Sequence, residues 1–326
     1  MNLLVFDIET VPDTAGGRRL YDTEGLSDED VARIMFHQRR QKTGGDEFLP
    51  HHLHRIVAIS VCLRRGDQLK VWSLGDSESS ESELIQRFFE GLERFSPTLV
   101  SWNGGGFDLP VLHYRALLHG IAAPRYWDVG EQDSGFRWNN YLSRFHWRHT
   151  DLMDVLSGFQ GRAVAPLQDI ALLLGQPGKM GMAGSLVWDA YLAGELGRIR
   201  DYCETDVLNT YLVYLRFQLM RGQLDAESYA TEQARVRSLL VADAEALDLR
   251  GTRTDTQRIT LAGMSFGIIV HERPLQGTRF WTREARDDID LEAIRIDHAK
   301  DLAATGRIIV LNREADFRGE LLKIIH

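Results

Sequence analysis

The chain begins with the stretch Leu3-Leu4-Val5-Phe6-Asp7-Ile8-Glu9, whose apolar residues predict a buried strand over residues 2–8. Asp7 and Glu9 are separated by one residue, so their side chains point to the same face of that strand. Two ionised carboxylates so close together repel each other, and a cation between them relieves the repulsion. Ligands that offer only oxygen suit Mg2+ or Mn2+. The stretch therefore predicts a metal site at the end of a buried strand.

The composition limits the class of protein. The chain has 326 residues, 44% hydrophobic and 26% charged, as is ordinary for a globular protein. Its apolar runs are too short to cross a membrane, and its start does not have the pattern of a signal peptide. The net charge of −9 argues against a broad basic surface that coats nucleic acid, but metal ions held by carboxylates can still attract phosphate. Cys62 and Cys203 lie in apolar segments, which predicts reduced core residues and a cytoplasmic protein.

The period of the apolar residues predicts the remaining elements. Further strands are expected over residues 55–63, 68–74 and 99–102, and helices over residues 27–41, 82–95, 109–119, 166–174, 184–194, 196–221 and 225–240. This order indicates an α/β fold with a mixed sheet. The composition shifts near residue 245, which predicts one domain over residues 1–245 and a C-terminal extension of unassigned role over residues 246–326. In the extension, strands are expected over 268–270 and 307–311 and a helix over 283–300.

A further acidic residue, Asp108, ends the segment Trp102-Asn103-Gly104-Gly105-Gly106-Phe107-Asp108. The segment joins a predicted strand to a predicted helix, and its glycines permit close approach of a ligand to the backbone. Pro110 suits the first turn of that helix, so Asp108 lies at or just before the helix start. An N-cap is the simplest role for an aspartate there. No Gly-Lys-Ser/Thr follows the glycines, which argues against a Walker phosphate loop.

The third element is the pair Tyr202 and Asp206, which are four residues apart and share one face of a predicted helix. The apolar residues of this helix put Asp206 on or beside the buried stripe, where a carboxylate without a partner is costly. The neighbouring acids Asp201 and Glu204 point elsewhere and are expected to be solvated. Taken alone, Tyr202 is a core tyrosine whose hydroxyl has some hydrogen-bond partner.

Four carboxylates, those of Asp7, Glu9, Asp108 and Asp206, can thus converge on one metal site. The order Asp-x-Glu, Asn-x3-Phe-Asp and Tyr-x3-Asp resembles the DEDD 3′–5′ exonuclease superfamily, also called DnaQ-like, and the tyrosine resembles its DEDDy branch. The phrases over residues 5–13 and 202–211 look like the bacterial stand-alone group of predicted 3′–5′ exonucleases that are similar to family-B polymerases. The resemblance covers roughly residues 1–240.

The resemblance implies a ribonuclease-H-like fold, with a mixed β-sheet of about five strands flanked by helices. It also implies that Asp7, Glu9, Asp108 and Asp206 hold two divalent ions, Mg2+ or Mn2+, with Asp7 as the bridging ligand. Tyr202 would orient the attacking water or help to remove its proton. The expected partner is a nucleic acid with a free 3′ end, single-stranded DNA in preference to RNA, and the expected products are nucleoside 5′-monophosphates.

Substrate contacts are expected from three residues that match or adjoin these motifs. Thr10 follows Asp-x-Glu, at a position that often touches the terminal nucleotide in the family. Asn103 and Phe107 belong to the second motif, where Phe107 can act as a stacking wedge. Two structural roles stay open beside these: Phe107 can belong to the core, and Asn103 can hold the glycine loop.

Two other segments, the histidines of residues 51–54 and the aromatic residues of 136–148, are not expected to carry catalytic residues. His51, His52 and His54 do not have the spacing of a zinc site and are expected to form a solvated linker, next to Arg55 as a phosphate contact. Aromatic residues interleave with arginines over residues 136–148, which suits either a groove for a single strand or a packed flap, and the flap is favoured.

The alternative function is a non-catalytic module, on the same fold, that binds nucleic acid or another partner. The complete set of acids argues against it. A phosphatase of the haloacid dehalogenase type also begins with a strand and paired acids, but Glu9 replaces its second aspartate and no later lysine motif is present.

Overall fold

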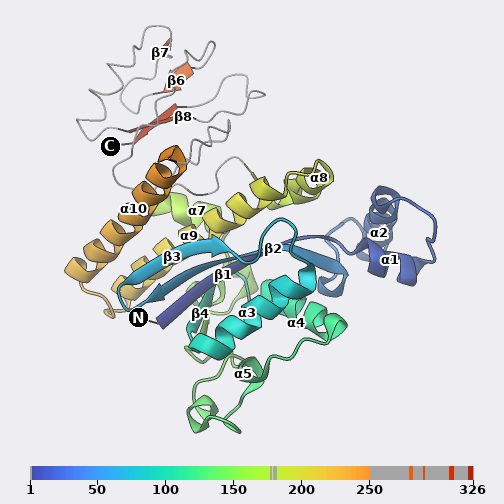
Figure 1. Cartoon of the computed structure of the whole chain (residues 1–326), viewed down its shortest axis with the longest axis horizontal. Coiled ribbons are helices and arrows are strands. Elements are labelled where there is room, and N and C mark those ends of the chain that lie inside the picture. Colours follow the sequence, from blue (N-terminus) through green and yellow to red (C-terminus); the bar gives the residue numbers. More distant parts are fainter. Residues whose placement is uncertain are drawn as a thin grey trace. The chain divides into compact units, whose positions relative to one another are not determined.

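A five-stranded mixed sheet forms the centre of the N-terminal part of the chain (Figure 1). The computed structural model describes residues 2–176, 178 and 182–249, and four short strands beyond them. The chain divides into two compact units, one of residues 1–168 and 182–214 and the other of residues 169–181 and 215–326. The sheet and every candidate site residue belong to the first unit.

The strand order of the sheet is β3-β2-β1-β4-β5. The strands are β1 (Asn2–Pro12), β2 (His54–Arg65), β3 (Gln68–Ser73), β4 (Thr98–Ser101) and β5 (His149–Asp151). The pairs β1–β2 and β2–β3 are antiparallel, whereas β1–β4 and β4–β5 are parallel. The prediction of an α/β fold with a mixed sheet of about five strands flanked by helices is confirmed.

Ten α-helices lie within the described residues. They are α1 (Thr14–Tyr21), α2 (Asp28–Thr43), α3 (Glu81–Phe95), α4 (Asp108–His119), α5 (Pro124–Trp127), α6 (Leu152–Leu156), α7 (Leu167–Leu173), α8 (Val187–Leu192), α9 (Leu196–Met220) and α10 (Ala226–Leu249). Short 3-10 turns are η1 (His51–Leu53), η2 (Ser134–Arg137), η3 (Gly161–Ala163) and η4 (Gly184–Leu186). No helix among these residues is both long enough and hydrophobic enough to cross a bilayer.

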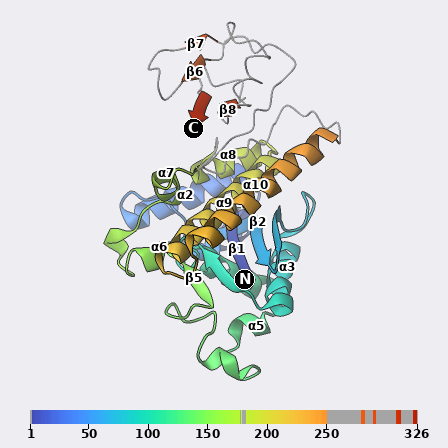
Figure 2. The ribbon, with the colours of Figure 1, turned by 90° about the vertical axis from the view of Figure 1, so that its left-hand side faces the viewer.

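Helices cover both faces of the sheet because alternate residues of β1 face opposite sides (Figures 1 and 2). On one face Leu4, Phe6 and Ile8 pack with α3 and α4, and the Phe6 ring lies 5.1 Å from the Phe88 ring of α3. On the other face lie α8 and the beginning of α9, which bury Val11 of β1. Asp7 and Glu9 alternate with the apolar residues of the first face, so they point to the α9 side.

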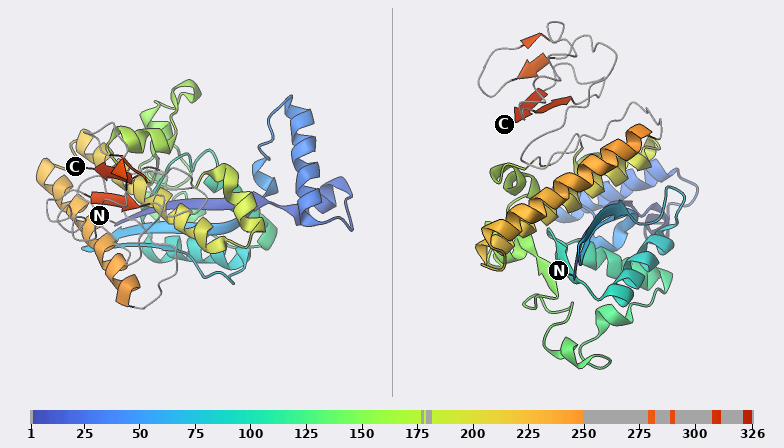
Figure 3. Two further views of the ribbon diagram at one scale, coloured as in Figure 1. Left: turned by 90° about the horizontal axis from the view of Figure 1, so that it is seen from above. Right: turned by 60° about the vertical axis from the view of Figure 1, so that its left-hand side comes forward.

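The pairing of β1 with β2 slips by one residue beside the two acids. Glu9 pairs with Ala58 but Thr10 pairs with Ile56, so Val57 is the extra residue of a β-bulge. Bulges bend a strand and re-aim its side chains, and they are common next to active sites. Here the bulge lies where β1 passes from the core to the segment that carries α1 and α2. Figures 1 and 3 show these two helices, in blue, beyond the end of the sheet.

The side chain of Ser27 caps the start of α2. The Ser27 hydroxyl accepts a hydrogen bond from the Asp30 N–H at 3.1 Å and donates to the Asp30 carboxylate at 2.7 Å. This satisfies one of the N–H groups that the first helical turn leaves without an intrahelical partner. The helix ends at Thr43 and is followed by the C-cap residue Gly44, whose φ of 79° suits glycine.

The second unit contains α10 and a small sheet of strand order β7-β6-β9-β8. Its strands are β6 (Arg279–Trp281), β7 (Ile289–Asp290), β8 (Ile308–Leu311) and β9 (Leu322–Ile325). β8 confirms the strand predicted over 307–311, whereas β7 lies inside the run for which a helix was predicted, so that prediction is wrong at these residues. The strand predicted over 268–270 lies outside the described residues, and the domain boundary at 245 stays a prediction.

Candidate active site

Asp7 and Glu9 stand on the α9 face of β1, as their spacing predicts. One side-chain ligand atom from each of Asp7, Glu9 and Cys203 can be chosen so that all three lie within 4.8 Å of one another. The Glu9 side chain is buried, and Asp7 is partly exposed. Burial of two neighbouring carboxylates is unfavourable unless a cation or hydrogen bonds compensate for it. The pair therefore has the composition of a cation site.

Asp108 is the first residue of α4 and reaches back to the sheet. Its carboxylate accepts a hydrogen bond from the Ile8 N–H at 3.1 Å, between the two acids of β1. Phe107 occupies the N-cap position of α4, so the simple prediction that Asp108 serves as an N-cap is wrong. Burial raises the pKa of Asp108 to about 7, and the negative charges of Asp151 and Asp206 add to the rise. A divalent cation is the group that relieves this excess of negative charge.

Tyr202 and Asp206 approach the same place from α9. Both are buried, with exposed fractions of 4% and 5%. Burial raises the pKa of the Tyr202 phenol, with further contributions from the charges of Asp206, Glu9 and Asp7 and from the hydrogen bond that the phenol donates to Asp206. The predicted sharing of one helix face is thus realised. The Tyr202 phenol is a hydrogen-bond donor, and the Asp206 carboxylate lies one helix turn from it on the same face of α9.

Cys203 is a neighbour of the acids that the sequence placed only in the core. It is buried and free, as is Cys62. Its thiol donates to the Asp7 backbone oxygen at 3.4 Å and to the Asp7 carboxylate at 3.6 Å. Burial and the charges of Asp7 and Glu9 raise the pKa of the thiol well above its usual range, so the sulfur keeps its proton. Cys203 therefore acts as a hydrogen-bond donor that fixes the orientation of Asp7.

The glycine loop between β4 and α4 is held by Asp151. The Asp151 carboxylate accepts hydrogen bonds from the Asn103 N–H at 2.9 Å and the Gly105 N–H at 2.8 Å, and it also caps α6. Asn103 has a φ of 65°, a left-handed conformation that asparagine tolerates. A Cβ atom on Gly104 would lie 2.4 Å from the Ser101 hydroxyl, so only glycine fits there. This places Asn103 in the loop framework and gives Asp151 a structural role.

Thr10 contacts His54, and the hydrogen-bond partners of His54 determine which of its ring nitrogens carries the proton. The His54 Nε2 lies 3.0 Å from the Leu49 carbonyl, which can only accept, so Nε2 carries the proton. Burial lowers the pKa of His54 to about 4, so the neutral ring leaves Nδ1 as an acceptor for the Thr10 hydroxyl at 2.9 Å. Thr10 therefore directs its proton to His54 and keeps its oxygen lone pairs for another donor.

The predicted solvated linker of histidines is wrong in part. His54 is buried, and His51 lies within hydrogen-bond distance, 2.9 Å, of the Gly106 carbonyl. The Phe107 ring packs against His54 at 5.1 Å, Phe48 at 5.5 Å and His51 at 5.7 Å between centroids. These four rings form an aromatic cluster directly beside Thr10 and Asp108. Sequence patterns gave no signal for it, because its members come from separate segments with no shared period.

Glu204 is also placed differently from the prediction, whereas Asp201 is exposed as expected. The Glu204 carboxylate accepts hydrogen bonds from the Ser73 N–H at 3.0 Å and the Ser73 hydroxyl at 2.7 Å. One turn earlier on α9, Arg200 donates to four backbone carbonyls, those of Ser73, Leu74, Gly75 and Asp76. The two side chains fasten α9 to the end of β3.

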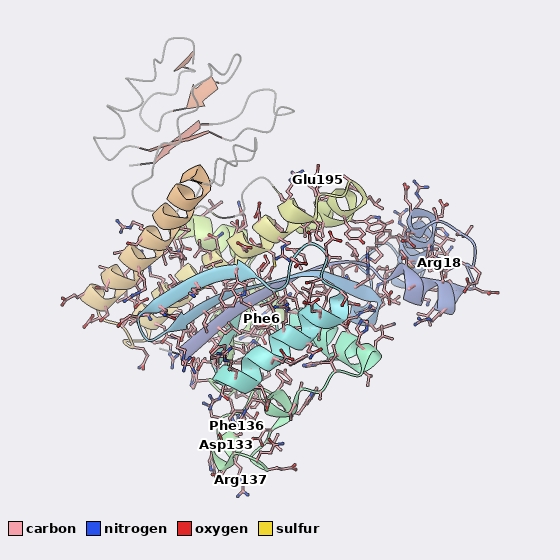
Figure 4. The ribbon with its side chains drawn as sticks, in the orientation of Figure 1. Phe6, Arg18, Asp133, Phe136, Arg137 and Glu195 are labelled. Carbon is pink, nitrogen blue, oxygen red and sulfur yellow. The ribbon has the colours of Figure 1, made fainter. Side chains whose placement is uncertain are left out.

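The aromatic segment between α5 and β5 agrees with the packed flap that the sequence favoured. Phe136 and Tyr141 are almost completely buried, whereas Trp138 and Phe145 are exposed. Figure 4 labels Phe136 in this segment. The guanidinium group of Arg148 stacks 4.7 Å from the centroid of the Phe136 ring. Arg148 therefore packs on the buried aromatic rings of the segment, whereas Arg144 stacks on the exposed ring of Phe145 and on Phe159.

The predicted phosphate contact, Arg55, stacks instead on an aromatic ring. Its guanidinium carbon lies 5.0 Å from the centroid of the Tyr191 ring of α8. A stacked guanidinium can still donate in its plane.

Known proteins resemble this chain over part of its length. Residues 46–252 match the family described as "Predicted 3'-5' exonuclease related to the exonuclease domain of PolB". A stretch of 46 residues is 44% identical to the catalytic subunit of DNA polymerase epsilon from Saccharomyces cerevisiae, and it covers 14% of this chain and 2% of that protein.

The family B DNA polymerase from the archaeon Pyrobaculum calidifontis, a solved structure, is 19% identical. Its superposition has a TM-score of 0.39 and covers 76% of this chain and 29% of that chain. The chain thus corresponds to only a small part of either polymerase.

Proposed function

We propose, from the premise that this chain belongs to the family of predicted 3′–5′ exonucleases related to the exonuclease domain of PolB, that it removes nucleotides from the 3′ ends of nucleic acids with the help of divalent metal ions. The proposal depends on one observation above the others. Acids from β1, α4 and α9 lie near one another: the Asp108 carboxylate accepts from the Ile8 N–H between Asp7 and Glu9, and, after burial, the charge of Asp206 adds to the rise of the pKa of Asp108.

In this proposal the carboxylates of Asp7, Glu9, Asp108 and Asp206 would hold two ions, Mg2+ or Mn2+, because these hard cations bind oxygen ligands. Such ions supply charge stabilisation for a phosphodiester under attack and lower the pKa of a bound water. The protein residues hold and orient the reacting groups. Tyr202, whose proton is donated to Asp206, would present its oxygen to the attacking water as a hydrogen-bond acceptor, and Cys203 keeps Asp7 in its orientation.

Thr10 gives the site a way to recognise the terminal nucleotide. Because its hydroxyl proton is directed to His54, its oxygen presents lone pairs to a donor, and the 3′ hydroxyl of a chain end is such a donor. We assign the preferred substrate as single-stranded DNA and the products as nucleoside 5′-monophosphates. Asn103 and Phe107 complete the proposed substrate contacts, and the two buried free cysteines support a cytoplasmic location.

The test is the incubation of purified protein with a 5′-labelled single-stranded oligonucleotide and Mn2+, beside the same oligonucleotide with a blocked 3′ end. Shortened products are expected only from the free end and only with metal. Asp7→Ala should abolish them, while Asp201→Ala, which changes an exposed acid of the same protein, should leave them. Equal products from Asp7→Ala and the unchanged protein would contradict the proposal. Binding without any turnover would support the non-catalytic module instead.

A further inference from the structure

Phe48 is an exposed aromatic residue whose backbone is fixed. Its side chain is 54% exposed, although large apolar rings gain most from burial. Its N–H donates to the Asp46 carboxylate at 2.9 Å, and its carbonyl accepts from the Arg39 side chain at 2.7 Å. The next residue, Leu49, is buried in a small core with Val31 and Met35 of α2. The ring is therefore held in a defined place rather than on a loose loop.

The ring of Phe48 forms the outer member of the aromatic cluster at the proposed active site. Its centroid lies 5.1 Å from that of His54 and 5.5 Å from that of Phe107. His54 contacts Thr10, which follows Glu9, and Phe107 precedes Asp108. Phe48 thus contacts the chain neighbour of Asp108 directly and reaches the chain neighbour of Glu9 through His54. Phe107 itself is only partly exposed and packs on the core, so it has less surface to offer a ligand.

We propose that Phe48 stacks on a nucleobase at the 3′ end of the substrate and so helps to position that end. The inference rests on the function proposed above. A rigid aromatic ring, already supported by other rings on one side, is a surface that any base can stack on, because every base has a π-face. Lys42, in the last turn of α2 next to this segment, supplies positive charge suited to the phosphates of the same strand, whereas Arg39 holds the Phe48 carbonyl and Arg40 is paired with Glu47.

The experiment compares single-stranded oligonucleotides that carry an abasic residue at the last, second-last or third-last position with the intact oligonucleotide. In the unchanged protein, kcat/KM should fall about 5- to 100-fold when the stacked base is missing. Phe48→Ala should remove this preference, so that intact and abasic oligonucleotides react equally. Phe48→Leu, which keeps apolar bulk without a π-face, should behave in the same way, whereas Phe48→Trp should restore the preference.

Trp127→Ala is the matched control. Trp127 is 52% exposed and contacts two rings, those of His113 and Tyr126, neither of which belongs to the aromatic cluster. It should keep the full preference for intact ends. The proposal is overturned if Phe48→Ala or Phe48→Leu keeps the preference at every position, or if Trp127→Ala loses it equally.

A binding measurement distinguishes failure of the stacking proposal from failure of the proposed exonuclease function. Fluorescence anisotropy with the same oligonucleotides in Ca2+ measures binding without requiring hydrolysis. If the unchanged protein cleaves nothing, the exonuclease proposal fails, but loss of base-dependent binding in Phe48→Ala would still support stacking. Equal binding of intact and abasic ends by the unchanged protein would overturn it.

Discussion

Replacement of Asp108 by asparagine should stabilise the metal-free protein while it abolishes activity. The Asp108 carboxylate is buried, and its pKa is raised to about 7 from an ordinary value of 3.8, first by burial and then by the charges of Asp151 and Asp206. The unfolded chain ionises this group from about pH 4, but the folded chain resists until about pH 7. The fold therefore loses stability as the pH rises through this window, and the penalty stays constant above it.

The size of the effect follows from the shift. One pKa unit corresponds to about 1.4 kcal/mol, so the ionised carboxylate destabilises the metal-free fold by up to about 4 kcal/mol. Asparagine removes the charge but keeps an oxygen that can accept from the Ile8 N–H. We expect Asp108→Asn to raise the free energy of unfolding by about 1–4 kcal/mol at pH 8 and to have little effect near pH 4.

The assay is urea unfolding in EDTA at both pH values, followed by thermal unfolding with and without Mn2+. Added Mn2+ should raise the Tm of the unchanged protein, since binding to the folded state alone stabilises it, and should raise that of Asp108→Asn much less. Asp201→Asn serves as the control because Asp201 is exposed and should respond to neither change. A free energy of unfolding at pH 8 that is the same for Asp108→Asn and the unchanged protein would refute the reasoning about buried charge.

Three further predictions concern other parts of the first unit. Arg115→Met should lower the free energy of unfolding by about 3–5 kcal/mol in urea, because it removes the buried guanidinium that pairs with two buried carboxylates, Asp13 at 2.6 Å and Glu81 at 2.5 Å; a loss under about 1 kcal/mol would contradict this. Cys203→Ala should raise the Mn2+ concentration for half-maximal activity about fivefold, and Cys203→Ser should raise it less, since a hydroxyl can still donate to Asp7; identical metal curves would refute the positioning role. Burial lowers the pKa of His149 to about 4, so protonation of this residue alone should cost the fold up to about 3 kcal/mol as the pH falls from 6.5 to 4, against the gain that Asp108 gives over the same range. His149→Gln should therefore become more stable relative to the unchanged protein as the pH falls; a stability difference between the two proteins that is the same at pH 6.5 and pH 4 would contradict it.

The acids of the candidate site could be predicted because each one lies in a local sequence pattern that marks it as unusual. Asp7 and Glu9 follow an apolar run, and Asp206 interrupts an apolar helix face. A charged residue at a position that the period assigns to the core is unfavourable without a partner, so it stands out in a single sequence. The helix of Asp108 was likewise indicated by the glycines and Pro110 around it.

The elements that the sequence did not predict lack such patterns. α1 includes Gly16 and Gly17, which weaken the helix period, and β5 is the polar tripeptide His149–Asp151. β5 is a strand because Leu99 and Val100 of β4 pair with it, and that pairing depends on the whole sheet. The aromatic cluster was missed for a similar reason. Phe48 and Phe107 come together only after α2 and the glycine loop have folded.

The position of α9 explains why contacts outside the motif matter for the chemistry. Arg200 and Glu204 lie on either side of Tyr202 in sequence, and both are tied to the backbone around Ser73. A helix fastened at two points one turn apart cannot rotate or slide by a residue without losing several hydrogen bonds. Tyr202 and Asp206 are thereby held toward β1, because rotation by one residue, about 100°, would turn both away from Asp7. Glu204, which was predicted to be solvated, thus helps to orient Tyr202 and Asp206 in the candidate active site.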